Sequence, residues 1–129
     1  MKKLLTLTLL TAASCFFVGK AMAETPLLIY GAPPRGQGTI FLGCINCNRS
    51  HPSSLANSIG DYGSRISDLS IYNRIGDYGS RISDVSACNS YASSPPIVVN
   101  GDGDVVGYLT VNRRTNGVIL DPRIIGACQ

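Results

Sequence analysis

The decapeptide Ile-Gly-Asp-Tyr-Gly-Ser-Arg-Ile-Ser-Asp occurs twice without change, at Ile59–Asp68 and at Ile75–Asp84, sixteen positions apart. The register extends beyond the identical block as a Ser-x-x-Asn motif, which begins at Ser54, Ser70 and Ser86. The third unit then diverges and meets Pro95-Pro96, through which a helix does not continue. Because a unit of this length is too short to bury a core alone, we expect the units to stack on their neighbours.

The repeats favour short helices, and the segments on either side of them favour strands. Helices of one or two turns are predicted over 53–58, 68–74 and 84–90, each opened by a serine or aspartate that can cap it. Strands are predicted over 27–30 and 39–42, over 97–99 and 105–111 around an Asn-Gly-Asp-Gly turn, and over 118–120. The expected fold is α+β, with a small antiparallel sheet packed against a stack of short sixteen-residue helix/turn repeats.

The N-terminus has the pattern of a secretory signal peptide. Lys2 and Lys3 precede an apolar run, and Ala21-Met22-Ala23 offers small residues before a cleavage site. The run is too short and too interrupted for a membrane anchor, although Cys15 stands in a segment that loosely resembles a lipidation signal. We therefore expect residues 1–23 to be removed and residues 24–129 to form one secreted or periplasmic domain, with a repeat region at 53–94 and a β-hairpin at 96–111.

The charge balance of the mature chain excludes one class of partner. Residues 1–23 hold three lysines and no acidic residue, so their removal leaves eight arginines against eight acidic residues. A formally neutral chain gives no overall electrostatic argument for nucleic acid or for an anionic membrane as its partner. We expect neither a nucleic-acid partner nor a membrane span in the mature protein.

Four cysteines remain in the mature chain, and an even number in a small exported domain indicates disulfides. They are Cys44, Cys47, Cys88 and Cys128. Four cysteines allow three pairings, and the sequence leaves all three open. We expect two bonds that stabilise a domain with few large apolar side chains.

Two other roles for these cysteines remain open. Zinc is the first alternative, because Cys44-x-x-Cys47 and the nearby His51 have ligand spacing and the two distant cysteines can complete a tetrahedral set. Thiol redox catalysis is the second, but no strand-and-helix pattern surrounds the Cys-x-x-Cys segment. No further cofactor is expected.

The repeat units also supply the candidate binding residues. Tyr62 and Tyr78 fall at the same place in two units, and an aromatic face among small polar groups suits carbohydrate or protein contacts. Arg65 and Arg81 each follow an aspartate by four residues. Local ion pairing is one reading of these arginines, and a row that grips a carboxylate or a sulfated sugar is the other.

The ordered set of motifs resembles a group of small, uncharacterised bacterial secreted proteins. The resemblance runs over about residues 41–112 and includes the Cys-x-x-Cys-Asn segment, the tandem Tyr-Gly-Ser and Ser-x-x-Asn units, the double proline and the hairpin after it. It implies export but no particular activity.

The function that these observations favour is a disulfide-stabilised binding or envelope-associated module, with carbohydrate or an envelope protein as its partner. A zinc-dependent structural or sensing domain is the alternative. We do not expect an enzyme. His51 is the one histidine, and Ser64 and Ser80 stand outside the G-x-S-x-G pattern of serine nucleophiles. A secreted hydrolase that works through His51 is the remaining, third reading.

Overall fold

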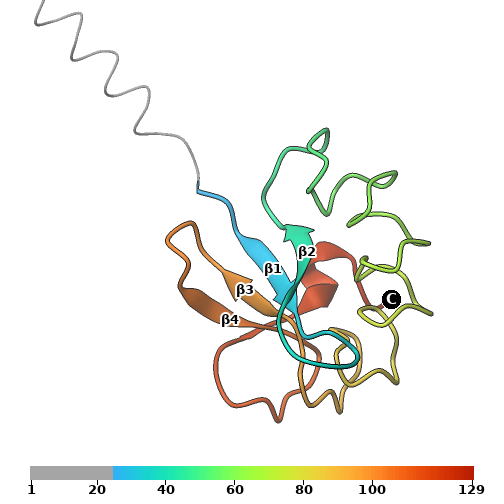
Figure 1. Ribbon diagram of the computed structural model, residues 1–129, viewed down its shortest axis with the longest axis vertical. Coiled ribbons are helices and arrows are strands. Elements are labelled where there is room, and N and C mark those ends of the chain that lie inside the picture. The colour runs from blue at the N-terminus through green and yellow to red at the C-terminus, as the bar shows by residue number, and fades with distance from the viewer. Residues whose placement is uncertain (1–24) are drawn as a thin grey trace, which may run out of the picture.

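The computed structural model describes residues 25–129, so the predicted signal peptide and Cys15 lie outside the described residues. A five-stranded sheet forms one side of the domain, in the order β2-β1-β3-β4-β5. Its strands are β1 (Leu28–Gly31), β2 (Ile40–Cys44), β3 (Ile97–Val99), β4 (Val105–Leu109) and β5 (Ile119–Leu120). Figure 1 shows the chain between β2 and β3 looping beside this sheet, with the C-terminal segment behind it.

The sheet confirms the predicted pairs and corrects one feature. β1 and β2 form an antiparallel pair joined by the loop 32–39, and β3 and β4 pair antiparallel around the Asn-Gly-Asp-Gly turn. The last strand lies parallel to β4, so the sheet is mixed and not purely antiparallel. In addition, β1 pairs with β3, which brings together strands separated by the whole repeat region.

Residues 49–96 contain no helix, so the three predicted repeat helices are wrong. The segment is instead a continuous run of turns, which we call the repeat array, made of three units at 49–64, 65–80 and 81–96. The only described helix is a short 3-10 helix, η1 (Pro122–Ile125), near the C-terminus. The α+β prediction therefore holds only in part, for the small sheet, because residues 49–96 form turns and not a stack of short helices.

Side-chain hydrogen bonds at every third residue explain why turns replace helices. In the second unit the N–H groups of Ser70, Asn73 and Gly76 each donate to the carbonyl three residues earlier. Ser70 Oγ also accepts the N–H of Tyr72, and Asn73 Oδ1 accepts that of Ile75. Such local acceptors compete with the helical pattern, and here they define a corner every three residues.

The asparagine of each unit closes its turn onto an earlier corner. Asn73 Nδ2 donates to the Ser67 carbonyl at 3.0 Å, and Asn89 Nδ2 donates to the Ser83 carbonyl at 3.0 Å. The corner residues are largely buried, yet no buried side-chain polar atom in the described chain lacks a hydrogen-bond partner. The array can therefore bury serine and asparagine without the cost of unsatisfied groups.

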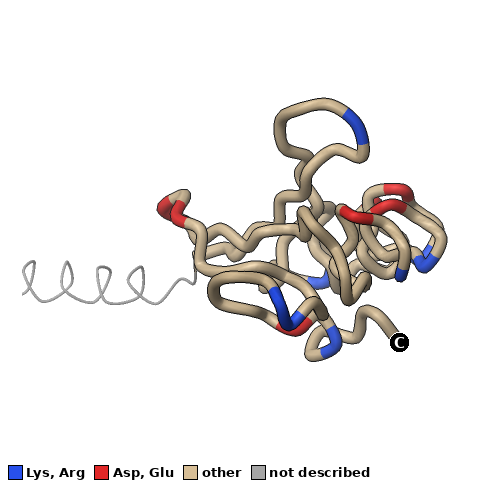
Figure 2. Tube along the Cα trace, turned by 90° about the horizontal axis from the view of Figure 1, so that it is seen from below, with Lys and Arg blue, Asp and Glu red and all other residues tan. Residues whose placement is uncertain are grey.

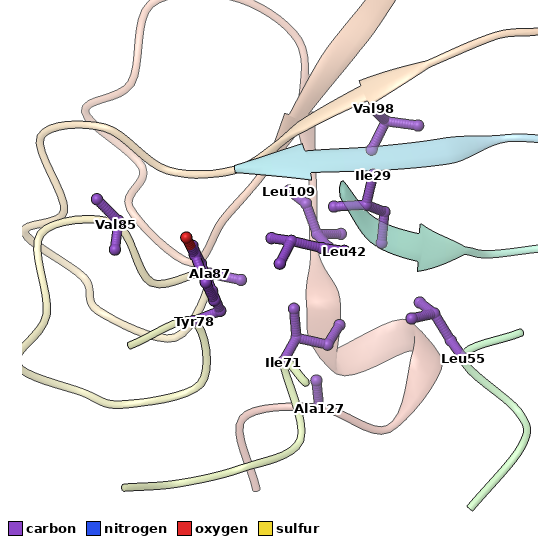
Figure 3. Packing of buried hydrophobic residues seen from close by; sticks show 10 residues of the cluster. All are labelled: Ile29, Leu42, Leu55, Ile71, Tyr78, Val85, Ala87, Val98, Leu109 and Ala127. Carbon is purple, nitrogen blue, oxygen red and sulfur yellow. The ribbon is translucent and has the colours of Figure 1, made fainter. Parts of the chain in front are cut away.

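The core lies between the array, the C-terminal segment and the sheet. Figure 3 shows side chains from the strands, the array and the tail converging in one cluster. The residue after the Ser of each Ser-x-x-Asn motif points inward in all three units. These residues are Leu55, Ile71 and Ala87, and their sheet partners in the cluster are Ile29, Leu42, Val98 and Leu109.

Candidate binding surface on the repeat array

Tyr62 and Tyr78, predicted as a displayed binding surface, face the sheet. Tyr78 is 3% exposed, and its hydroxyl donates to the Ala32 carbonyl at 2.9 Å. Tyr62 is partly buried and packs edge-on against Phe41 of β2, with ring centroids 5.1 Å apart. The prediction that Tyr78 is displayed is wrong, and both tyrosines dock the array onto β1 and β2.

The residue before the asparagine holds the C-terminal segment in two of the three units. In the second unit Tyr72 donates its hydroxyl to the Ile125 carbonyl at 2.7 Å, and burial raises the pKa of this phenol above its usual value. In the third unit the same position is Cys88, which is bonded to Cys128. Ala56, the equivalent residue of the first unit, is exposed. Two units therefore anchor the tail, and the first does not.

The four cysteines form two disulfides, as predicted, and the structure selects one of the three pairings. Cys44 is bonded to Cys47 with Cα atoms 5.5 Å apart, and Cys88 to Cys128 with Cα atoms 5.1 Å apart. No thiolate of these four is left to bind zinc, and residues 25–129 contain no cluster of three or more metal-ligating side chains. Cys44 is fully buried, so its sulfur is shielded from an external thiol.

His51, proposed as a zinc ligand or as a catalytic base, serves as a corner of the first unit. Its Nδ1 accepts the N–H of Ser53 at 3.0 Å. Ser67 and Ser83 occupy the same position in the next two units, and each accepts the N–H two residues later. His51 therefore has the same structural role as these two serines, because its side chain accepts a backbone N–H two residues later.

Arg65 and Arg81 are exposed and lie on the outside of the array. The structure does not support the reading of local ion pairs with the preceding aspartates: the one salt bridge within residues 25–129 joins Arg123 to Asp121. That bridge holds the pKa of the Asp121 carboxyl below its usual value, mainly through its hydrogen bonds with Arg123. The array arginines thus present their guanidinium groups to the surroundings.

Three hollows follow one another along the outside of the array. The first, of about 630 Å³, includes Arg49, Asn57 and Ile59 in its lining. The second, of about 360 Å³, has the equivalents sixteen residues later, Arg65, Asn73 and Ile75, and adds Ile66 and Arg74. The third, also of about 360 Å³, is lined by residues that include Arg74, Arg81 and Ile82.

The lining residues of these hollows include four isoleucines that the sequence interpretation missed as a surface feature. The four side chains are 89–95% exposed, whereas Ile71 of the same array is 1% exposed. They are Ile59, Ile66, Ile75 and Ile82, and three of the four directly follow an arginine. We call the surface formed by these isoleucines and Arg49, Arg65, Arg74 and Arg81 the arginine–isoleucine face.

The charges of the array are separated in space. Figure 2 shows the acidic and basic residues of the array on largely opposite sides of the tube. Among the four array aspartates only Asp68 lines one of the three hollows. The arginine–isoleucine face therefore carries local positive charge, although residues 24–129 hold equal numbers of basic and acidic side chains.

The signal that could have revealed this face is the repeat itself. Ile59 and Ile75 recur with the same sixteen-residue spacing as the buried Leu55 and Ile71.

The chain matches no protein-family model, no curated protein and no solved structure.

Proposed function

We propose that this protein is an exported, disulfide-stabilised binding module that attaches to a component of the cell envelope through the arginine–isoleucine face. Two disulfides support a chain that works in an oxidising compartment. No helix within residues 25–129 is long and apolar enough to cross a membrane. Attachment would then depend on the surface of the folded domain.

The observation that carries the proposal is the exposure of four isoleucines in a small domain. Burial of one isoleucine side chain is worth about 1.5–3 kcal/mol, and these four contribute almost none of that to folding. Scattered apolar residues on a surface need no explanation, but these line consecutive hollows beside four arginines. An apolar surface rimmed by charge is typical of an interaction site.

Carbohydrate is the weaker of the two predicted partners. Sugar recognition favours exposed aromatic faces, and the two repeat tyrosines that suggested it pack against the sheet. Tyr91 is the exposed aromatic of the third unit, and its ring lies under the Arg114 guanidinium at 5.7 Å. The face itself offers aliphatic side chains and guanidinium groups.

The test is association of the oxidised mature protein with washed envelope fractions of the producing cell. The Ile66→Ser/Ile82→Ser double variant should lose association by about tenfold or more, because two apolar contacts are removed from the face. The matched control is the Val105→Ser/Val118→Ser double variant, which alters two exposed valines outside the array. The control should bind like the unchanged protein.

Both variants should keep the circular dichroism spectrum and the thermal midpoint of the parent, since the four substituted side chains are exposed. Equal binding by all three proteins would refute the proposal. So would an isoleucine variant that unfolds, because those side chains would then serve the fold and not a partner.

A further inference from the structure

We infer that the partner of the arginine–isoleucine face is an anionic lipid surface, with the isoleucines entering the headgroup boundary and the arginines pairing with lipid phosphates. This inference rests on the proposed function, because it names the partner of the same face.

The exposed apolar side chains of the face are aliphatic, which suits contact with lipid better than contact with a sugar or a protein. Isoleucine has no polar atom and no aromatic face, so it offers a sugar neither a hydrogen bond nor a stacking surface. Protein interfaces concentrate binding energy in tryptophan, tyrosine and arginine within closely packed pockets. Four aliphatic side chains that are 89–95% exposed instead suit shallow entry into the boundary between headgroups and acyl chains.

The charge of the face complements an anionic surface. Four arginines line the three hollows, against the single aspartate Asp68. Guanidinium groups bind phosphate through paired hydrogen bonds, and no described carboxylate lies within salt-bridge distance of these four. Overall neutrality does not prevent this, because attraction to anionic lipid acts within about one Debye length, roughly 10 Å.

Repetition supplies the number of contacts that surface binding needs. The second hollow is lined by both Arg65-Ile66 and Arg74-Ile75, and Arg74 also lines the third hollow beside Arg81-Ile82. Each arginine–isoleucine pair combines one insertion point with one phosphate contact. A single weak anchor gives only marginal membrane attachment, whereas several anchors on one domain act together.

The experiment uses the oxidised mature protein and unilamellar vesicles of phosphatidylcholine, with and without phosphatidylglycerol. Co-sedimentation should show binding to the vesicles that contain phosphatidylglycerol, much weaker binding to phosphatidylcholine alone, and loss of binding in high salt. The Arg65→Gln/Arg81→Gln double variant should bind about 25-fold more weakly, at about fivefold for each cation. The Arg35→Gln/Arg113→Gln double variant removes two exposed arginines outside the three hollows and should lose much less.

Insertion can be read directly, because the chain contains no tryptophan. The Ile75→Trp variant should show a blue shift of its fluorescence with vesicles that contain phosphatidylglycerol. The Val118→Trp variant places the same reporter outside the array and should show none. A shift in both variants, or in neither, would overturn insertion through this face.

Failure of the lipid inference can be told apart from failure of the proposed function. Binding to envelope fractions without binding to vesicles would leave the proposed function standing and make the partner an envelope protein or glycan. Equal binding to both vesicle types would overturn the role of negative lipid charge, because both lipids carry a phosphate and only phosphatidylglycerol has a net charge. A concentration-dependent dimer in sedimentation equilibrium, abolished by Ile66→Ser/Ile82→Ser, would show that a second copy covers the face and would overturn the lipid inference.

Discussion

At the residue scale, short polar side chains direct the path of the backbone through the array. Ser54, Ser70 and Ser86 are fully buried, and each uses Oγ to accept the N–H two residues later. The same geometry recurs directly after β4, where Thr110 accepts the N–H of Asn112. Serine, threonine and asparagine provide these local acceptors, and leucine or alanine does not.

His51 provides a test of this corner rule. Replacement by serine should leave the free energy of unfolding unchanged or slightly raised, because serine is the residue at the equivalent positions 67 and 83. Replacement by alanine removes the acceptor for the Ser53 N–H and should cost about 1 kcal/mol, as the loss of a helix cap does. Urea denaturation of both variants measures the difference. Equal destabilisation by serine and alanine would show that the imidazole ring has a role of its own.

Gly63 and Gly79 mark a close approach between consecutive turns. A Cβ at Gly63 would collide with the Asn57 carbonyl, and one at Gly79 would collide with the Asn73 carbonyl. Gly63→Ala should therefore destabilise the domain by about 3 kcal/mol, the upper part of the usual range for overpacking. The matched control is Gly60→Ala, because the equivalent position of the third unit is already Ala92. If thermal denaturation shows Gly60→Ala to be the more harmful change, it would contradict the close approach of Gly63 to the Asn57 carbonyl.

At the scale of elements, the array is stabilised by its bonds to β2 and to the segment after β4, and not by helices of its own. Its first unit bonds to β2 through the N–H of Leu55 and the Cys44 carbonyl at 3.0 Å. Its third unit bonds to the segment after β4 through the N–H of Val111 and the Ala87 carbonyl at 3.0 Å. The array therefore depends on the sheet at both ends, which is expected of units too short to form a core alone.

The hydrogen-bonded hydroxyls of Tyr72 and Tyr78 predict a loss of stability at alkaline pH. Burial raises the pKa of Tyr72 and of Tyr78, with Asp77 as a second cause for Tyr78. A pKa raised in the folded state means that the stabilisation is complete below the unfolded value of about 10 and is lost as the pH rises through the folded value. Ionisation would remove the donors to the Ile125 and Ala32 carbonyls.

Denaturation midpoints measured between pH 8 and 11 check this prediction. The Tyr72→Phe variant lacks one of the two hydroxyl donors, so it should be less stable by about 1 kcal/mol at neutral pH. It should also lose less stability than the parent between pH 9 and 11. Parallel curves for the two proteins would show that Tyr72 does not titrate with unfolding.

At the scale of the whole molecule, the two disulfides act over very different lengths of chain. Cys44–Cys47 closes a separation of three residues, and Cys88–Cys128 closes one of forty and fixes the tail against the third unit. In the chain-entropy account a longer closed loop restricts the unfolded state more. That account gives about 4 kcal/mol for the long loop and about 2 kcal/mol for the short one.

Removing each disulfide separately tests which of the two stabilises the domain more. The Cys88→Ser/Cys128→Ser variant should be destabilised by about twice as much as the Cys44→Ser/Cys47→Ser variant in guanidinium denaturation. The tail should also become sensitive to a C-terminal exopeptidase in the first variant and stay protected in the second. A larger loss from the short loop would show that buried Cys44 contributes mainly through packing.

The strands were predictable because their signals are local. The Asn-Gly-Asp-Gly turn and its β-branched flanks indicate a hairpin without reference to the rest of the chain, and β3 and β4 form it. Capping rules could not show that the repeats form turns and not helices, because Ser and Asp also begin real helices. What distinguishes the array is an acceptor at every third residue, a period shorter than the 3.6 residues of a helical turn.

The sequence by itself determined the repeat, the even number of cysteines within residues 24–129 and most of the strands, since each of these depends on residues close together or on a count. Only the tertiary structure decided the cysteine pairing and which side of the array faces outward. Ile71 and Ile75 belong to the same unit and both recur as apolar positions, yet one is buried and the other is 95% exposed. Periodicity shows that side chains share a face, but the position of the sheet decides whether that face is covered.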